Sequence, residues 1–95
     1  MRTIKQEFNG PKRDDLNHIS FKQLKRNGMI VLYERSDGEY EIVKLLIKPA
    51  RTFTIQGRTV ETPEREHYPT GEEWNGRHTR SFQKALQIFN EFLTH

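Results

Sequence analysis

Two histidines and two glutamates lie close together in the second half of the chain. His67, Glu72, Glu73 and His78 fall within twelve positions, and imidazole nitrogens and carboxylate oxygens are ligands that Zn²⁺ accepts. The spacing does not match the helical HExxH pattern, in which two histidines share one face of a helix. The segment around them also has no periodicity. We therefore expect neither a metal ion nor a cofactor at this cluster.

A second set of acidic and basic residues lies in the predicted loop 36–38 and the strand that follows it. Asp37, Glu41 and Lys44 come close to the Asp…Glu-x-Lys arrangement of metal-dependent nucleases. That chemistry needs the glutamate and the lysine two positions apart on one face of a strand, whereas three positions separate them here. None of the serines follows a nucleophile-elbow pattern, and the chain has no glycine-rich phosphate loop. The residue pattern therefore gives enzymatic function the least support.

The charges are distributed unevenly, although the net charge is only +3. Residues 1–26 contain seven lysines and arginines against three carboxylates, while residues 61–73 contain five glutamates against one arginine. Clustered cations can displace counterions from phosphates, and exposed aromatic rings can stack on bases. Solvation of an ordinary protein surface is the favoured explanation of the same cations, because a dedicated nucleic-acid-binding protein shows a more strongly basic face. The candidate nucleic-acid-binding residues are Lys12, Arg13, Lys22, Lys25, Arg26, Arg77 and Arg80.

The elements that position these residues begin with two predicted hairpins. Residues 29–35 and 40–47 are rich in strand formers, and Ser36-Asp37-Gly38 between them fits a three-residue loop. That register places Leu32 opposite Ile42 and Val31 opposite Val43. Both faces of this hairpin carry apolar residues, so we expect each face to be partly covered. A shorter hairpin is predicted over residues 52–62, with Gly57 in its turn.

Helices are predicted at both ends of the chain. A short N-terminal helix would begin at Asp14 or Asp15 and end at Gly28, although residues 21–24 are equally compatible with irregular structure. The C-terminal helix would be capped by Thr79 or Ser81. Its apolar residues recur at helical spacing and form one continuous stripe. The stripe comprises Phe82, Ala85, Leu86, Phe89, Phe92 and Leu93.

Length and composition predict one small domain over residues 1–95, with residues 1–13 as a flexible end. Apolar residues make up 33% and aromatic residues 11% of the chain, a mixture too aromatic for a disordered tail. The chain contains no cysteine, and no stretch approaches the roughly 20 apolar residues of a membrane helix. The first eight residues have no apolar core of a secretory signal. We expect a cytoplasmic α+β protein with an antiparallel sheet of three to four strands against the C-terminal helix.

Residues 63–78 are predicted to form a long loop, because they are rich in proline, glycine and charge. A loop of this length in a small domain is often functional. Trp74 could plug the sheet, as most tryptophans are largely buried, or it could anchor a protein partner. The candidate partner-binding residues are Tyr68, Glu72, Glu73 and Trp74.

The segments Tyr40–Lys44, Glu66–Pro69 and Gly71–Gly76, followed by a phenylalanine-rich helix, resemble small uncharacterised open reading frames of phages and other mobile elements. The resemblance spans about residues 28–93 and implies a compact, non-catalytic accessory protein. The sequence as a whole favours an interaction module that contacts a protein, and nucleic-acid binding is the alternative. The oligomeric state stays open, because an uncapped edge strand could pair with a second copy.

Overall fold

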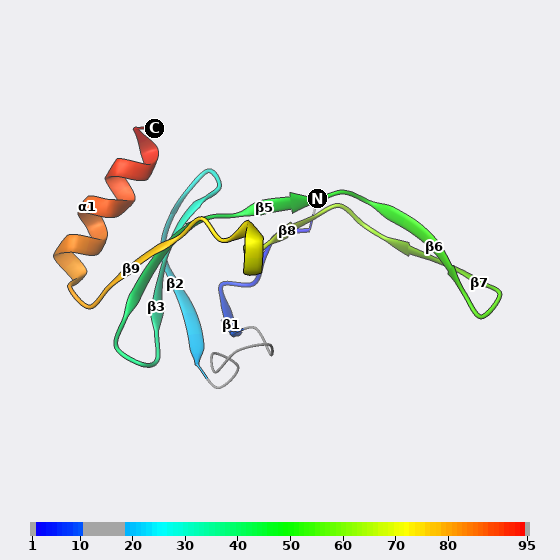
Figure 1. Cartoon of the computed structure of the whole chain (residues 1–95), viewed down its shortest axis with the longest axis horizontal. Coiled ribbons are helices and arrows are strands. Elements are labelled where there is room, and N and C mark those ends of the chain that lie inside the picture. The colour runs from blue at the N-terminus through cyan, green and yellow to red at the C-terminus, as the bar shows by residue number, and fades with distance from the viewer. Residues whose placement is uncertain (1, 11–18, 95) are drawn as a thin grey trace.

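A five-stranded antiparallel sheet forms the body of the protein, in the order β1-β2-β3-β4-β9. The computed structural model describes residues 2–10 and 19–94. A two-stranded extension, β5–β8 followed by β6–β7, leads away from this sheet (Figure 1). The elements are β1 (Glu7–Asn9), β2 (Ser20–Asn27), β3 (Ile30–Arg35), β4 (Tyr40–Lys44), β5 (Leu46–Lys48), β6 (Arg51–Ile55), β7 (Arg58–Thr62), β8 (Arg65–His67), the 3₁₀ turn η2 (Gly71–Glu73), β9 (Arg77–Thr79) and α1 (Phe82–Leu93).

The predicted α+β class and the C-terminal helix are confirmed, while the predicted number of three to four strands is too low for the main sheet. Helix α1 packs on β3, β4 and β9. The hydroxyl oxygen of Ser81 accepts a hydrogen bond from the Lys84 backbone N–H (3.2 Å), as predicted for the cap. Ala85, Ile88 and Phe89 are buried. Within the described part of the chain, no helix has the length and apolar character needed to cross a bilayer.

The central hairpin β3–β4 has the predicted register. Val31 lies opposite Val43 and Leu32 opposite Ile42, and the Arg35 backbone N–H donates to the Glu39 carbonyl across the loop (2.8 Å). Gly38 has a φ of +89°, a conformation that glycine adopts without steric cost. The three-residue loop therefore sets the pairing from which the rest of the sheet extends.

The expectation that both faces of this hairpin are covered is also confirmed. On one face, Leu32 and Ile42 pack with Ala85, Ile88 and Phe89 of α1. The opposite face carries an aromatic cluster, in which Phe8, Phe21, Tyr33 and Tyr68 lie at centroid distances of 5.2 to 6.1 Å. Figure 1 shows α1 on one side of the sheet and η2 on the other. The sheet is thus the middle layer of a small three-layer body.

The predicted N-terminal helix is wrong over its second half, because Ser20–Asn27 form strand β2. Its start at Asp14 or Asp15 lies outside the described residues. Phe21 and Gln23 face the same way and pair with Arg35 and Tyr33, and the register shifts between Gln23 and Lys25. This shift breaks the strict alternation that identifies a strand in a sequence. Gly28, expected to end a helix, instead has a φ of +60° in the β2–β3 turn.

Residues 63–78 carry more regular structure than the loop that the sequence predicts. Strand β8 pairs with β5, and β9 pairs with β4 as an edge of the main sheet. Asn75 continues the β4 edge with its side chain, since its Oδ1 accepts from the Lys44 backbone N–H and its Nδ2 donates to the Lys44 carbonyl (2.9 Å each). Three-residue strands are too short to show a periodicity in the sequence.

Candidate functional site

A two-stranded ribbon, called the arm and comprising residues 46–67, projects from the main sheet (Figure 1). Its inner part is the β5–β8 pair and its outer part the β6–β7 hairpin, which pairs with no other described strand. The arm gives the molecule its long dimension, with overall extents of 52 × 30 × 23 Å (Figure 1). At its tip, Gln56 and Gly57 have φ values of +51° and +77°, as in the type I′ turn that joins two strands tightly.

Alternation along the outer arm separates two faces of different chemistry. Phe53 lies opposite Val60, and Ile55 lies opposite Arg58. Because residues two positions apart point the same way, these four side chains share a face with Arg51, whose guanidinium carbon lies 5.9 Å from the Phe53 ring centre. This surface, Arg51, Phe53, Ile55, Arg58 and Val60, is called the arm face. The other face carries Thr52, Thr54, Thr59 and Glu61.

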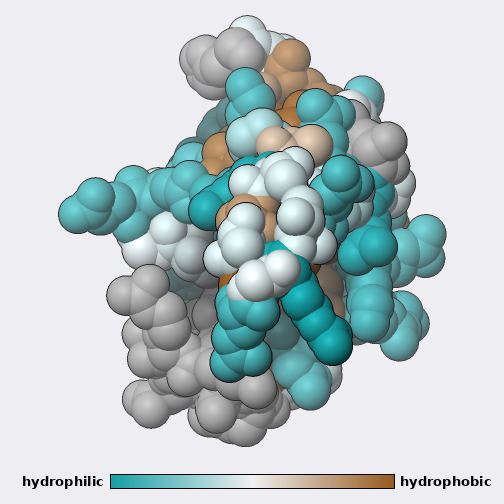
Figure 2. Space-filling model, turned by 90° about the vertical axis from the view of Figure 1, so that its right-hand side faces the viewer, coloured by the Kyte–Doolittle hydropathy of each residue, from teal (hydrophilic) through white to brown (hydrophobic). Residues whose placement is uncertain are grey.

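The arm face is exposed although its centre is apolar. Ile55 is 51% exposed and Val60 37%, and neither belongs to the two clusters that form the core. Figure 2 views the molecule along the arm from its tip and shows small apolar patches between hydrophilic and intermediate residues. Neither Arg51 nor Arg58 forms an ion pair with another described residue. The arm therefore presents apolar and cationic groups to solvent.

The base of the arm is attached firmly to the body. Arg2 adds to the outer edge of β8 in parallel orientation, with its N–H bonded to the Glu64 carbonyl and its carbonyl to the Glu66 N–H (2.9 and 2.8 Å). The Glu66 carboxylate accepts from both terminal nitrogens of Arg26, and these hydrogen bonds lower the pKa of Glu66. Lys48 Nζ lies 3.0 Å from Glu73. The freely projecting part is therefore β6–β7.

A buried polar network underlies the aromatic face of the sheet. Arg35 Nη1 donates to Glu41 Oε1 (3.0 Å), and the Tyr68 hydroxyl donates to Glu41 Oε2. Burial raises the pKa of Glu41, while Tyr68 and Arg35 act to lower it. Burial together with the neighbouring Glu41 carboxylate raises the pKa of Tyr68 far above its ordinary value. Glu41 is 2% and Tyr68 7% exposed, so these groups satisfy one another inside the body.

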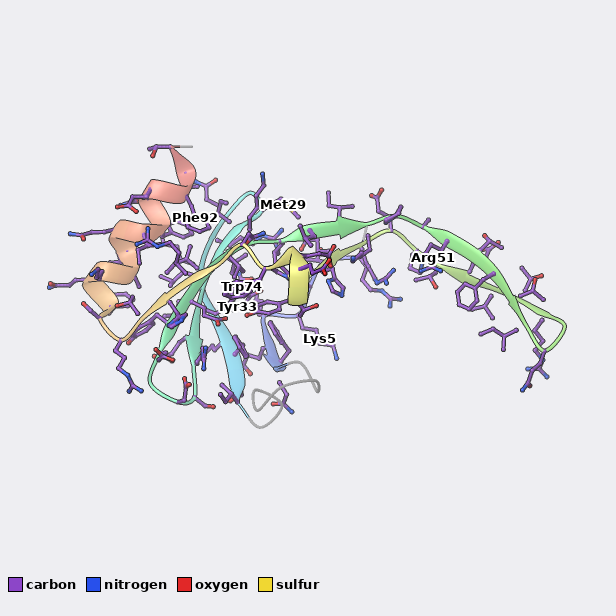
Figure 3. All side chains as sticks on the ribbon, in the orientation of Figure 1. Lys5, Met29, Tyr33, Arg51, Trp74 and Phe92 are labelled. Atoms are coloured by element: carbon purple, nitrogen blue, oxygen red, sulfur yellow. The ribbon has the colours of Figure 1, made fainter. Side chains whose placement is uncertain are left out.

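The four candidate partner-binding residues divide between the core and the surface. Tyr68 is a core residue. Glu72, Glu73 and Trp74 lie at η2, near the base of the arm (Figure 3). Trp74 is 40% exposed yet packs 6.0 Å from the Tyr68 ring. It therefore covers the sheet, as the plug hypothesis predicts, and still offers part of its ring to solvent. Glu72, Glu73 and Trp74 together form the acidic turn.

The candidate nucleic-acid-binding residues do not gather into one free basic surface among the described residues. Arg26 is bound to Glu66, and Arg77 to Glu91 (2.9 Å). Lys25 lies 5.4 Å from the centre of the Phe89 ring. Lys22 stands in register between Glu7 and Glu34. Arg80 is exposed, and Lys12 and Arg13 lie outside the described residues.

The two histidines of the metal hypothesis belong to different sheets. His67 pairs with Leu46 in the arm, whereas His78 pairs with Glu41 in the main sheet. His78 Nδ1 lies 3.2 Å from the Glu39 carboxylate. Over residues 2–10 and 19–94, no three histidine, aspartate or glutamate side chains come together in a way that could hold a metal ion.

Sequence reasoning identified the second hairpin but missed the residues of the arm face. The signal was the alternation of Arg51, Phe53 and Ile55 with threonines, followed across the turn by Arg58 and Val60. Alternation of this kind ordinarily indicates a strand with one buried face. The sequence does not show that no layer covers that face.

Comparisons of the chain with protein-family models, curated proteins and solved structures found no match. The surfaces and contacts of this chain are therefore the basis for assigning its function.

Proposed function

We propose that this chain is a non-enzymatic interaction module that binds a protein partner through its arm. The observation that carries the proposal is the exposed arm face, an apolar centre of Phe53, Ile55 and Val60 between two arginines. An isolated two-stranded hairpin is marginally stable in water. A partner that covered this face would add the burial that the arm alone does not have.

The composition of the arm face fits a protein better than a nucleic acid. Protein interfaces are enriched in aromatic residues, methionine and arginine and depleted in lysine and glutamate. The arm face contains one aromatic residue and two arginines, both of the enriched kinds, and neither lysine nor glutamate, and its opposite face is mainly threonine. The affinity of a protein for nucleic acid grows with the number of phosphate contacts. The outer hairpin, residues 51–62, has only two arginines to make such contacts.

A capture experiment with face-specific variants tests the proposal. Tagged wild-type chain, a Phe53→Ser/Val60→Ser variant and a Thr54→Ser/Thr59→Ser control from the opposite face would be exposed to extract that also contains untagged chain. We expect a protein that wild type and control retain and that the arm-face variant loses by at least tenfold. Its binding should be reproduced with purified components by calorimetry. Retention of the same proteins by all three chains would contradict the proposal.

Nucleic-acid binding through Lys22, Lys25 and Arg80 is the alternative outcome. Fluorescence anisotropy with labelled single-stranded and duplex DNA and RNA separates the two, because phosphate contacts weaken steeply as salt rises. We expect flat titrations at physiological salt. Saturable binding that is lost in a Lys22→Glu/Lys25→Glu variant and retained in the arm-face variant would replace the protein-binding proposal.

A further inference from the structure

The molecule carries two exposed surfaces of opposite charge, and each surface has an apolar group at its centre. The arm face places Arg51 and Arg58 around Phe53, Ile55 and Val60. The acidic turn places Glu72 and Glu73 beside the exposed part of the Trp74 ring. Glu72 forms no ion pair with another described residue, and neither do the two arginines. Each surface has the chemistry that the other would bind.

These two surfaces lie apart within one chain. The acidic turn is at the base of the arm, where Glu73 contacts Lys48 of β5, whereas the arm face belongs to the outer hairpin (Figures 1 and 3). The inner arm is fixed to the body by the Arg2 bridge and by the Arg26–Glu66 ion pair. The arm therefore leads its own face away from its own acidic turn, and a complementary surface has to come from another molecule.

We infer that the protein partner of the arm is a second copy of this chain, and that two copies exchange arms so that each arm face covers the acidic turn of the other. This inference rests on the proposed function and names the partner. The Trp74 ring of one copy would lie against Phe53 and Val60 of the other, and Arg51 and Arg58 would lie beside Glu72 and Glu73.

The size of the arm face favours a reciprocal contact. Its five-residue strands are about 17 Å long. The area of a single contact along strands of that length is small compared with the roughly 800 Å² that each partner buries in a stable interface. A twofold exchange forms the contact twice, because the same surface pair recurs in both directions. Such an exchange requires two complementary surfaces on the same chain, and the arm face and the acidic turn are such a pair.

Charge reversal on each surface provides the test. Sedimentation velocity would compare wild type with variant X, Arg51→Glu/Arg58→Glu, and variant Y, Glu72→Lys/Glu73→Lys. A control variant, Arg80→Glu/Lys84→Glu, makes the same charge change as X at exposed positions away from both surfaces. Circular dichroism would confirm that each variant is folded.

We expect a concentration-dependent dimer for wild type and for the control, and monomers for X and for Y alone. An equimolar mixture of X and Y should form a dimer, because one contact would pair the reversed arm of X with the reversed turn of Y and the other would pair the unchanged arm of Y with the unchanged turn of X. Higher salt should weaken the wild-type dimer. Rescue in the mixture is specific to this pairing, since neither a folding defect nor a dimer through other surfaces would produce it.

Three results would overturn the inference. The first is a wild-type chain that remains monomeric at about 1 mM, where a Kd of that order already populates the dimer. The second is a dimer that X and Y both retain, which would place the contact elsewhere. The third is an X and Y mixture that stays monomeric. If another protein is captured through the arm face while the wild-type chain is monomeric, the proposed function stands and the second copy is excluded as partner.

Discussion

The central hairpin β3–β4 and the outer hairpin β6–β7 are built by similar sequence rules and end in different environments. Each joins strands of five or six residues through a turn that contains a glycine with positive φ. In the central hairpin, Val31, Leu32, Ile42 and Val43 are fully buried, whereas Val60 in the outer hairpin is 37% exposed. The difference comes from the neighbours, because α1 and the aromatic cluster cover the first hairpin, whereas no layer formed by residues 2–10 or 19–94 covers the outer one.

The comparison shows that local pattern and burial are separate properties. Strand-forming residues and a suitable turn are enough to define a hairpin, but its contribution to stability depends on the layers packed against it. Global stability should therefore depend strongly on body residues and weakly on arm residues of the same type. Matched substitutions in the two regions test this difference directly.

The largest difference is expected for arginine. Arg35→Met removes the guanidinium from the buried Glu41 carboxylate, and loss of one member of a buried ion pair costs about 3–5 kcal/mol. Arg58→Met, in the exposed arm, should change the free energy of unfolding by less than about 0.5 kcal/mol. Urea denaturation of both variants and of the wild type measures the two changes in the free energy of unfolding. Equal effects would show that the arm is as integral to the folded body as the sheet.

Truncation of an aliphatic side chain should also lower the free energy of unfolding much more in the body than in the arm. Leu32→Ala leaves a cavity between the sheet and α1, for which about 2–5 kcal/mol is expected. Ile55→Ala removes a side chain that is already half exposed and should cost about 0.5 kcal/mol or less. If Leu32→Ala does not fold, Ile42→Val, with an expected loss of about 0.5–1.5 kcal/mol, replaces it. The contrast fails if Ile55→Ala proves as damaging as the core variant.

Two glycines give a smaller contrast of a different kind. A Cβ at Gly76 would lie 2.6 Å from the Trp74 ring and 2.7 Å from a Val43 methyl, so Gly76→Ala should cost about 1–3 kcal/mol through overpacking. It should also shift the emission of Trp74, the one tryptophan of the chain.

A Cβ at Gly57 would meet no atom of the described residues within 4 Å, but Gly57→Ala keeps a φ of +77°. Its strain is confined to the arm tip, so both the denaturation midpoint and the Trp74 emission should remain close to wild type. An emission shift in Gly57→Ala, or its absence in Gly76→Ala, would contradict the packing described here.

The smallest expected effect is a pH dependence at the base of the arm. Hydrogen bonds from Arg26 lower the pKa of Glu66 in the folded chain below the unfolded value of about 4.3. A lowered pKa contributes stability above the unfolded pKa, and this contribution is lost as the pH falls through the folded pKa. The difference in free energy of unfolding between wild type and Glu66→Gln should be constant above about pH 5. It should decrease toward zero as the pH falls below about 4. A gap that widens on acidification would reverse the sign of this interaction.

The sequence predicted the fold best where local signals were long and regular. The register of β3–β4, the Ser81 cap and the C-terminal helix follow from turn chemistry and periodicity, and all three are confirmed. The apolar stripe of α1 is confirmed at its centre only, because Phe82 and Leu93 are exposed and Ile88, outside the stripe, is buried. Strand β2 was mistaken for a helix because the register shift between Gln23 and Lys25 spreads its apolar residues unevenly. Strands β8 and β9, three residues each, carry no usable periodicity and exist through pairing with distant strands.

The candidate site was less predictable than the fold. Trp74 packs against Tyr68 and is 40% exposed, so its contact and its exposure could not both be read from the sequence. Tyr68 was assigned to a partner surface, although its hydroxyl satisfies buried Glu41. Arg26 is a candidate nucleic-acid-binding residue in the sequence, although Glu66, 40 residues away, binds it in the structure. Partners at this sequence separation are not visible in composition or in local charge counts.

The sequence by itself determined the local elements of this protein: its hairpins, its C-terminal helix and the alternation that places apolar residues on chosen faces. Those features depend on turn geometry and on contacts between near neighbours, which are encoded within a few residues. The tertiary structure decided which apolar faces are buried and which charges are neutralised. Such outcomes depend on segments far apart in the chain, and for this reason Val43 lies in the core while Val60 faces solvent.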